Sequence, residues 1–456
     1  MSIFKACDVR GVYGDEIDET MARLIGRSLG NMMRRRSESA ICVGGDFRRS
    51  TPALKNALIE GLLETGAMVR DLGQLATPII YFAGRHLQCP NVAIVTASHN
   101  AAKYNGVKFM LAGRPAIPEL MSELEKGLHE PTHATMTGCT ECLQHETILN
   151  AYTQEITRQA AGLAGHKPPV DMKILLDTME GVYTEIAPAM LAALGTRVIS
   201  LSDRIDPDYA KRTPNPSVDK NIQELCTRVP AESADLGIAL DGDGDRVIFV
   251  DHTGTIARPE QIGALLVREC FAQPTAVYDQ KCASILEASV LAAGGQAIMQ
   301  PSGYGFIKSM MIDRRADMGL EVSGHHFFKV LGGGDDGLFT ALLLVFLLNR
   351  LGNPLAKLIE AIGWPAISPD LRIPLGEDIQ KVLERIAAGC GGKVTRLDGV
   401  RAEYEDGWAL ARASITEPVI TLRFEGRAPE NMRTIAKRFL ATEPGLCKKA
   451  MEIIDD

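Results

Sequence analysis

Short apolar runs alternate with amphipathic segments through most of the chain. The run "AICVGG" (40–45) precedes a helical pattern over 52–64, and "NVAIV" (91–95) is a β-branched run bounded by polar residues. The same order of strand-like and helix-like patterns restarts at "MKILLD" (172–177) and at "TAVYDQK" (275–281). Alternation of this kind predicts βαβ units and mostly parallel sheets.

The pattern changes toward the C-terminus. Strand-like runs such as "VRAEYED" and "VITLRFEG" predominate there, with helical patterns over 376–388 and 429–440, which is typical of an α+β domain. Segments rich in proline, glycine or polar residues mark candidate boundaries. We therefore predict an α/β protein with three similar mixed α/β domains and a C-terminal α+β domain. The expected domains are 1–149, 150–251, 252–366 and 367–456.

Composition narrows the class of protein. The chain has 456 residues, 46% of them hydrophobic, and a net charge of -8, which argues against a nucleic-acid partner. The most apolar stretch, 338–348, is about half the length of a membrane-spanning helix and predicts a buried helix. No secretory signal is recognisable, and ten cysteines without a regular framework indicate reduced thiols. We expect a cytoplasmic protein with neither a membrane nor a nucleic-acid partner.

The motif "CTEC" supplies a possible half of a zinc site. Cys139 and Cys142 have the CxxC spacing, and His133 and His145 lie nearby in the sequence. A tetrahedral zinc site needs four ligands, and no second CxxC pair follows. We interpret the segment as a surface loop.

The stretch "ALDGDGDRV" (239–247) is the sharpest local signal. Asp241, Asp243 and Asp245 alternate with glycines at the end of an apolar strand, so their carboxylates can converge on a cation such as Mg²⁺. An EF-hand loop is excluded because Arg246 stands where glycine is required and His252 where the acidic ligand is required. The alternative is a solvated acidic turn. Three carboxylates after a buried strand repel one another without a cation, which favours the metal site.

A second reactive stretch is "VTASHNAAKYNGVKF" (95–109). Ser98 follows a predicted strand, where α/β folds display reactive groups, and His99 and Lys108 are expected in the same loop. The GxSxG motif of esterases is missing, and so is the P-loop of many ATP-binding enzymes. "GGGDDG" (332–337) lacks the strand and helix context of a dinucleotide site.

The stretch "EVSGHHFF" (321–328) offers groups that bind sugar hydroxyls. Glu321, Ser323 and His325 occupy alternate positions of what we expect to be an extended segment. A carboxylate and a hydroxyl can hold two neighbouring sugar hydroxyls. A core turn is equally compatible with these residues.

The stretch "RASITEP" (412–418) offers a phosphate clamp. Arg412, Ser414 and Thr416 alternate on a predicted loop between two strands, although a capped turn would have the same composition. A metal with a serine at one place, a polyol binder at another and a phosphate clamp at a third point to a phosphate moved within one sugar.

These stretches, together with "DVRG" (8–11) and "DQKCAS" (279–284), resemble the signature loops of the α-D-phosphohexomutase superfamily. The resemblance is nearest to its bacterial phosphomannomutase/phosphoglucomutase branch and runs through nearly the whole chain. It implies four domains around a central active-site cleft, each contributing one loop. The implied activity interconverts hexose 1-phosphate and hexose 6-phosphate, of mannose or glucose, through a phosphoserine and a bisphosphorylated sugar. An aminosugar-phosphate mutase, a metal-dependent phosphatase and a non-catalytic sugar-phosphate-binding paralogue are the alternatives.

The resemblance also implies roles for individual residues. Ser98 would carry the phosphate, and one Mg²⁺ per chain would be held by its phosphate and the three aspartates. Lys108 would be the general acid/base, with a hexose 1,6-bisphosphate as activator and intermediate. The implied partner is a phosphosugar, and the protein would be a monomer or a homodimer. The residues implied to assist transfer are Arg10, His99 and Arg246, and those implied to bind substrate are Lys281, Glu321, Ser323, His325, Arg412, Ser414 and Thr416.

Five positions depart from the usual pattern of the family. Cys7 stands for tyrosine, Gly45 for arginine, Ala101 for proline, Tyr304 for histidine and Ile415 for asparagine. The serine, the aspartates and the lysine are intact, so we expect the chemistry to be retained. The departures are expected to bear on specificity.

Overall fold

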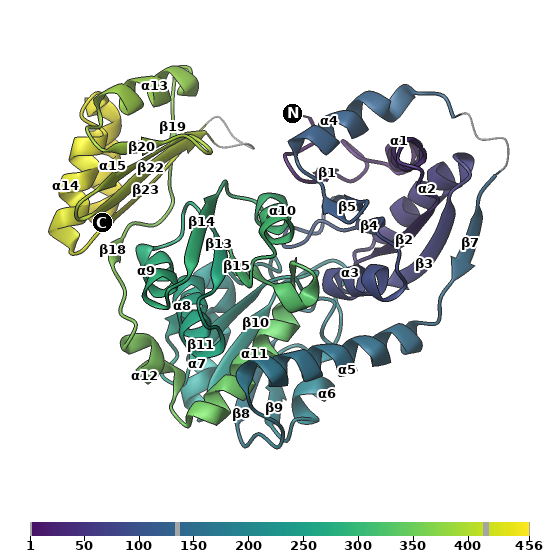
Figure 1. Ribbon diagram of the computed structural model, residues 1–456, viewed down its shortest axis with the longest axis horizontal. Helices are drawn as coiled ribbons and strands as arrows, with labels where there is room; N and C mark the ends of the chain where they lie inside the picture. Colours follow the sequence, from purple (N-terminus) through teal and green to yellow (C-terminus); the bar gives the residue numbers. More distant parts are fainter. Residues whose placement is uncertain (1, 133–136, 414–418, 456) are drawn as a thin grey trace.

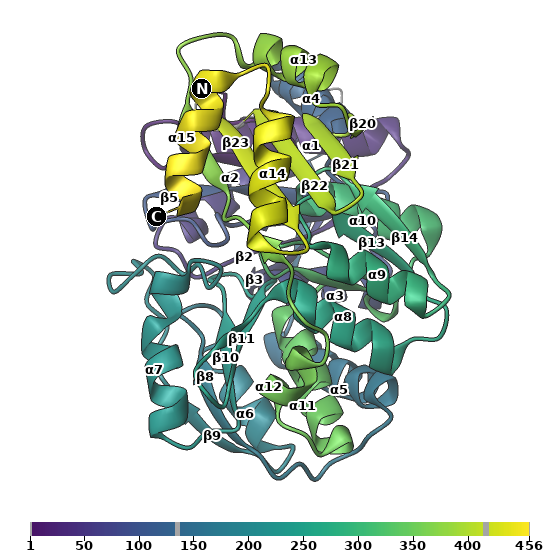
Figure 2. The same cartoon turned by 90° about the vertical axis from the view of Figure 1, so that its left-hand side faces the viewer.

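The computed structural model describes residues 2–132, 137–413 and 419–455 and divides them among four β-sheets, which follow one another along the chain (Figure 1). The first three sheets mix parallel and antiparallel strand pairs, and the fourth is antiparallel throughout. Helices lie against each sheet, as the view in Figure 2 also shows. The predicted class, three mixed α/β units followed by an α+β unit, is confirmed.

The first sheet comprises β1 (Val9–Val12), β2 (Ala40–Gly45), β3 (Met68–Gln74), β4 (Val92–Val95), β5 (Tyr104–Leu111), β6 (Arg114–Pro115) and β7 (Cys139–Cys142). Its helices are α1 (Glu19–Arg35), α2 (Thr51–Glu64), α3 (Thr77–His86) and α4 (Pro118–Lys126), followed by the 3₁₀ helix η1 (Gly127–His129). The strand order is β1-β5-β4-β2-β3-β7. Strands β4, β2 and β3 are parallel because α2 and α3 cross between them.

The second and third sheets share one plan, a parallel core followed by an antiparallel reversal. The second sheet contains β8 (Lys173–Asp177), β9 (Arg197–Ser200), β10 (Leu236–Leu240), β11 (Val247–Asp251) and β12 (Ile256–Ala257). Its helices are α5 (His145–Ala164), α6 (Ala187–Ala192), η2 (Asp219–Ile222) and α7 (Gln223–Ala231). The third sheet contains β13 (Thr275–Asp279), β14 (Gln296–Gln300), β15 (Met318–Leu320), β16 (His326–Phe328) and β17 (Gly334–Asp335). Its helices are α8 (Pro259–Cys270), α9 (Ser284–Ala292), α10 (Tyr304–Arg314), η3 (Lys329–Leu331), α11 (Gly337–Leu351) and α12 (Leu355–Glu360).

The fourth sheet has a hydrophobic core of its own, separate from those of the first three units. Its strands are β18 (Ala366–Ile367), β19 (Leu371–Pro374), β20 (Lys393–Thr395), β21 (Val400–Tyr404), β22 (Gly407–Ala413) and β23 (Val419–Gly426). Its helices are α13 (Ile379–Gly389), α14 (Pro429–Phe439) and α15 (Pro444–Asp455). Figure 1 shows this unit at the end of a thin connection from α12.

Reactive stretches predicted from the sequence coincide with connections between consecutive antiparallel strands. They join β4 to β5, β10 to β11, β15 to β16, and β22 to β23. A connection this short permits only an antiparallel partner, so the prediction of mostly parallel sheets is wrong at these strands. The loops after β4, β10 and β15 therefore begin and end at the same edge of their sheets, which anchors them at both ends. The residues that connect β22 to β23 lie outside the described part of the chain.

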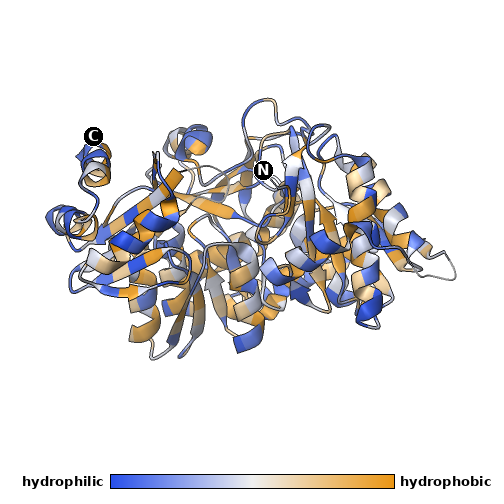
Figure 3. Ribbon diagram, turned by 90° about the horizontal axis from the view of Figure 1, so that it is seen from above, coloured by the Kyte–Doolittle hydropathy of each residue, from blue (hydrophilic) through white to orange (hydrophobic). Residues whose placement is uncertain are grey.

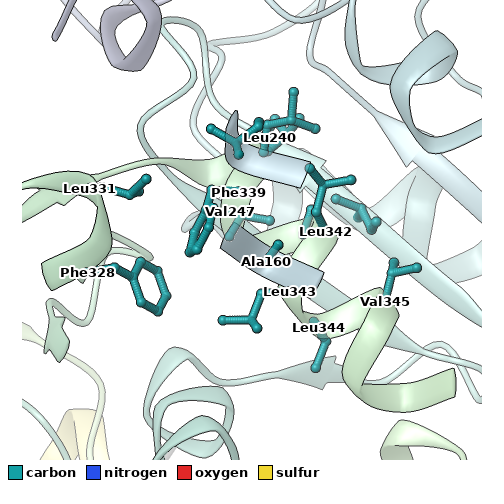
Figure 4. Close-up of a cluster of buried hydrophobic side chains, with 14 of the residues drawn as sticks. Ala160, Leu240, Val247, Phe328, Leu331, Phe339, Leu342, Leu343, Leu344 and Val345 are labelled. Atoms are coloured by element: carbon teal, nitrogen blue, oxygen red, sulfur yellow. The ribbon is translucent and has the colours of Figure 1, made fainter. Parts of the chain in front are cut away.

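A continuous core of buried side chains joins the first three units. Helix α11 crosses its centre, and residues 338–348 are buried, which confirms the predicted buried helix. Figure 4 shows Leu342 and Leu343 of this helix among side chains of the second and third units. The rings of Phe328 and Phe339 pack edge to face, with their centroids 4.8 Å apart. Figure 3 shows hydrophobic colouring along the strands and polar colouring on many outer helical faces.

The CxxC segment is an edge strand and not the predicted surface loop. Cys139 and Cys142 form β7, which pairs with β3 in parallel, and both side chains are exposed. His145 begins α5, and His133 lies outside the described residues. Neither of the two groups of potential metal ligands found among the described residues includes these cysteines. A search of the same residues finds no helix with the length and hydrophobicity to cross a membrane.

The start of α11 depends on Asp336. Its buried carboxylate accepts hydrogen bonds from Phe339 N at 3.0 Å, Tyr152 Oη at 2.8 Å and Tyr183 Oη at 3.3 Å. Burial raises the pKa of Asp336 to about 7. This one side chain therefore caps the helix and also satisfies two buried hydroxyls.

We expect Asp336→Ala to lower the free energy of unfolding by about 2–4 kcal/mol, because a cap is lost and, although Tyr152 and Tyr183 lie 2.6 Å apart and can bond each other, one of the two buried hydroxyls loses its acceptor. Calorimetry of the variant measures this loss. Asp18→Ala removes the exposed cap of α1, which bonds Met21 N alone, and is the matched control with a smaller effect. Equal effects of the two substitutions would contradict the assigned role.

Candidate active site

Ser98 lies in a strained turn after β4. Its φ is +52°, in the left-handed region that non-glycine residues rarely adopt, and its side chain is fully buried. The backbone N–H of Ser98 donates to Thr96 Oγ1 at 2.9 Å. Strain of this kind persists only where surrounding contacts hold it, and such positions cluster at functional sites.

Arg48 supplies those contacts, although sequence reasoning missed it. The buried guanidinium donates to the carbonyl oxygens of Ser98 and Asn100, both at 2.7 Å, and to Ala101 O at 2.9 Å. Its charge is paired with Asp46, with 3.1 Å between Nε and Oδ2. No local motif marks Arg48, because the loop it holds lies about fifty residues further along the chain.

The three aspartates of the β10–β11 loop meet beside Ser98. Their oxygens lie within 4.8 Å of one another, and Asp241 Oδ2 accepts from Ser98 Oγ at 3.3 Å. Glycine spacing is required, since a Cβ on Gly242 would lie 2.8 Å from the Ser98 carbonyl oxygen. The described residues provide no hydrogen-bond partner for the buried Oδ1 atoms of Asp243 and Asp245. Buried carboxylate oxygens in this arrangement suit a hard divalent cation.

Lys108 reaches the same carboxylates from a strand and not from the loop expected for it. It lies within β5, opposite Ile94, and its Nζ is 2.8 Å from Asp243 Oδ2 and 2.6 Å from Asp245 Oδ2. Burial lowers the pKa of Lys108, but Asp243 and Asp245 outweigh burial and raise it overall. The lysine is therefore cationic and can donate a proton.

His99 and Arg10 border the serine on another side. His99 Nδ1 is 3.2 Å from Ser98 Oγ, and burial, together with the positive charges of Arg246, Arg10 and Lys108, lowers the pKa of His99 well below its usual value. The imidazole is therefore neutral. Arg10 on β1 donates from Nη1 to Asn100 Oδ1 at 3.1 Å, which ties β1 to the serine loop.

The segment of Glu321, Ser323 and His325 is a turn, so the expected extended conformation is wrong. Gly324 has a φ of +99° and donates from N to Glu321 O at 3.0 Å, which closes a reversal between β15 and β16. His325 points inward. It accepts from Arg246 Nε on Nε2 at 2.7 Å, and its Nδ1 lies 2.8 Å from Asp335 Oδ2.

The residues predicted to bind substrate are only partly brought together. Lys281 and Ser323 line one pocket of about 610 Å³, which Arg423 and Asp370 also line although neither was predicted. Lys281 Nζ lies 3.2 Å from Asp370 Oδ2.

Most of the predicted phosphate clamp lies outside the described residues. Arg412 Nε lies 3.2 Å from Asp398 Oδ2. Ser414, Ile415 and Thr416 lie outside the described residues.

Comparison with known proteins assigns the chain to a family. The models of the phosphoglucomutase/phosphomannomutase alpha/beta/alpha domains I, II and III match residues 1–134, 150–254 and 258–363, and the model of the C-terminal domain matches 371–442. The chain belongs to the phosphoglucomutase/phosphomannomutase family.

Relatives in this family match along their whole length. A phosphomannomutase/phosphoglucomutase of Pseudomonas aeruginosa is 36% identical over 446 residues, covering 96% of this chain and 94% of that protein. A phosphoglucomutase of Neisseria gonorrhoeae is 32% identical, covering 96% of each chain. The crystal structure of a phosphoglucomutase/phosphomannomutase family protein from Burkholderia thailandensis superimposes with a TM-score of 0.88 at 31% identity, covering 97% of this chain and 98% of that one.

Two departures from the pattern of the phosphoglucomutase/phosphomannomutase family contact each other. Tyr304 donates from Oη to Cys7 O at 2.8 Å. A Cβ on Gly305 would lie 2.8 Å from Cys7 Sγ, so the thiol packs against this glycine. The centroid of the Tyr304 ring also lies 5.3 Å from Lys108 Nζ, so the ring faces the lysine that bonds the aspartates. The two substitutions therefore form one contact at the edge of the aspartate cluster.

Added Mg²⁺ is expected to stabilise the protein, because a cation relieves repulsion among the three buried aspartates. At about 100 times its dissociation constant, the gain is about 2.7 kcal/mol. Calorimetry with Mg²⁺ or with a chelator measures it. Asp243→Asn should abolish the response, whereas Asp203→Asn, at an exposed position, should retain it. A response that survives in Asp243→Asn would contradict the site.

Proposed function

We propose that the protein is a phosphohexomutase that interconverts hexose 1-phosphate and hexose 6-phosphate, of mannose or glucose, through phosphorylated Ser98. One observation carries this proposal: the buried Ser98 hydroxyl lies 3.3 Å from Asp241 in a cluster of three aspartates completed by Lys108. The family of the chain supports the same reaction, since the relatives described above are named phosphomannomutase/phosphoglucomutase and phosphoglucomutase.

We propose Mg²⁺ as the resident cation, held by Asp241, Asp243, Asp245 and a phosphate oxygen on Ser98. The donor set supports this choice, because it consists of hard carboxylate oxygens, two of which have no hydrogen-bond partner among the described residues. When bound, the cation neutralises charge on the transferring phosphoryl group.

The side chains around Ser98 suit the two proton transfers of the cycle. When the phosphoryl group leaves Ser98, the freed Oγ needs a proton, and we propose that it comes from cationic Lys108, which bonds the same aspartate cluster as Ser98. When Ser98 accepts the second phosphate, its hydroxyl must lose a proton, and neutral His99 at 3.2 Å is positioned to accept it. Arg10 and Arg246 add positive charge for the transferring group.

His325 is proposed to act by positioning Arg246. Both of its ring nitrogens have protein partners, on one side Arg246 and on the other Asp335. Because the arginine Nε–H can only donate, His325 must accept on Nε2 and carry its proton on Nδ1. The resulting chain from Asp335 to Arg246 fixes the direction of the guanidinium.

Substrate recognition is proposed to use two further regions. Lys281, Glu321 and Ser323 would bind the sugar, and Arg412 with Ser414 and Thr416 would bind the phosphate that is not being transferred. The buried hydroxyl of Ser323 has no hydrogen-bond partner among the described residues, which supports a role in binding. A hexose 1,6-bisphosphate would be both intermediate and activator.

We propose domains at 1–149, 150–251, 252–366 and 367–456, supported by the four matched segments of the family. We further propose a phosphosugar as the partner, a monomer or homodimer as the assembly, and the cytoplasm as the location.

The function is tested by supplying glucose 1-phosphate or mannose 1-phosphate with Mg²⁺ and a catalytic amount of the bisphosphate, while measuring the 6-phosphate and free phosphate together. We expect the isomer to form without stoichiometric phosphate release. Free phosphate matching substrate consumption would indicate a phosphatase, and binding without either product would indicate a non-catalytic paralogue. Running glucosamine 1-phosphate in parallel tests the aminosugar alternative.

Two substitutions separate the roles within the site. Ser98→Ala should abolish turnover, because no carrier remains, while exposed Ser39→Ala should leave it unchanged. Lys108→Met should lower kcat about 100- to 10 000-fold, the usual contribution of a positioned proton donor. If Ser98→Ala turned over substrate at the wild-type rate, the phosphoserine cycle would be refuted.

A further inference from the structure

A pocket of about 460 Å³ lies between α3, α10 and the loop before β17. Tyr81, Arg85, Cys89, Met110, Lys308 and Gly332 are among the residues that line it. None of the residues assigned above to catalysis, metal binding or substrate recognition lines this pocket. Its two cationic side chains come from different units of the chain, Arg85 from α3 and Lys308 from α10.

Lys308 is a buried cation without a hydrogen-bond acceptor. Its side chain is 2% exposed, and the described residues offer no partner for Nζ. Its ammonium group lies against the face of Tyr81, with 3.3 Å between Nζ and the ring centroid. A cation–π contact stabilises the charge but leaves the N–H donors of the ammonium group without an acceptor. Burial lowers the pKa of Lys308 to about 8.

Arg85, an exposed residue, brings a second cation without an ion pair among the described residues to the same pocket. Its guanidinium reaches one protein acceptor, the Tyr81 carbonyl at 3.5 Å, and no ion pair is found for it among the described residues. A Cβ on Gly334 would lie 3.8 Å from Arg85 Nη1 and 3.9 Å from Lys308 Nζ. The two nitrogens therefore both lie within 4 Å of the same position beside Gly334. Gly332, with a φ of +69°, leaves room for the arginine stem, since a Cβ there would lie 2.8 Å from Arg85 Cδ.

The carboxylate with the largest electrostatic effect on Lys308 is that of Asp335, which favours the charged lysine. Asp335 Oδ2 is bonded to His325, whereas Asp335 Oδ1 and Lys308 Nζ both have no hydrogen-bond partner among the described residues. Two converging cations therefore face a pocket whose remaining wall is largely apolar, which is the arrangement that recognises an oxyanion.

We propose that this pocket binds a small oxyanion, a phosphate monoester or a carboxylate, between Lys308 and Arg85. The site is separate from the proposed mutase reaction and does not depend on it. Asp335 acts electrostatically on Lys308 and bonds His325, which in turn bonds Arg246. A ligand in the pocket would therefore change the charge around residues that border the proposed active site.

Pyridoxal 5′-phosphate is the probe, because it joins a phosphate to an amine-reactive aldehyde. The Lys308 amine adds to the aldehyde and water leaves, forming an imine, and borohydride supplies the hydride that reduces the C=N bond to a stable secondary amine. Peptide mapping of the full chain then locates the label.

We expect labelling of Lys308, protection by inorganic phosphate, and at least a tenfold loss of labelling (about the effect of one charge-assisted hydrogen bond) in Arg85→Gln. Arg314→Gln, at an exposed position on the same helix as Lys308, is the matched control and should label as wild type. Arg85→Gln should keep its basal activity, which shows that it folds.

Protection by acetate as well as phosphate would support a general oxyanion site, and protection by phosphate alone a phosphate site. An unlabelled Lys308, or labelling unaffected by both phosphate and Arg85→Gln, would overturn the proposal.

Discussion

The structure depends on holding three like charges together inside the protein. Asp241, Asp243 and Asp245 are at most 1% exposed, with oxygens within 4.8 Å of one another. At an effective dielectric constant of about 20, two ionised carboxylates at this separation would repel by at least about 3.5 kcal/mol. Burial and the charges of Asp245 and Asp243 accordingly raise the pKa of Asp241 well above its usual value. Lys108 offsets part of this repulsion through two ion pairs, and Thr77 donates to Asp243 at 2.8 Å. The negative charge that remains favours the binding of a cation beside Ser98, where a phosphoryl group would need its own charge neutralised.

Hairpin topology brings these groups to one place. The serine loop, the aspartate loop and the Glu321–His325 turn each connect two antiparallel neighbours, so each is anchored at both ends by strand pairing. Cross-links between units complete the arrangement. Thr77 N donates to Asp243 O at 2.9 Å, and Arg246 bonds His325 of the third unit. The site is thus built from rigid edges of separate sheets, which is the condition for positioning a phosphoryl group.

The sequence correctly predicted those features that depend on a single continuous stretch of the chain. The glycine-spaced aspartates, the serine after a strand and the buried helix α11 are local patterns, and the structure places them as the patterns indicate. Arg48 was missed because the backbone carbonyls that it bonds lie about fifty residues away in the sequence. Asp335 was missed because the pairing of β16 with β17, which brings it to His325, is not visible in the local pattern. Lys108 was expected in a loop because hydrophobic patterning does not show where a hairpin ends. The turn at Gly324 was missed since its positive φ depends on tertiary contacts as well as on glycine.

The central claim is that Ser98 carries the phosphate, and the mass of the intact protein tests it most directly. The full chain is incubated with a hexose 1,6-bisphosphate and Mg²⁺, and the modified peptide is then mapped. The account predicts an addition of about 80 daltons, one phosphoryl group, on Ser98. An unmodified Ser98 under these conditions, or a phosphate located on another residue, would contradict it.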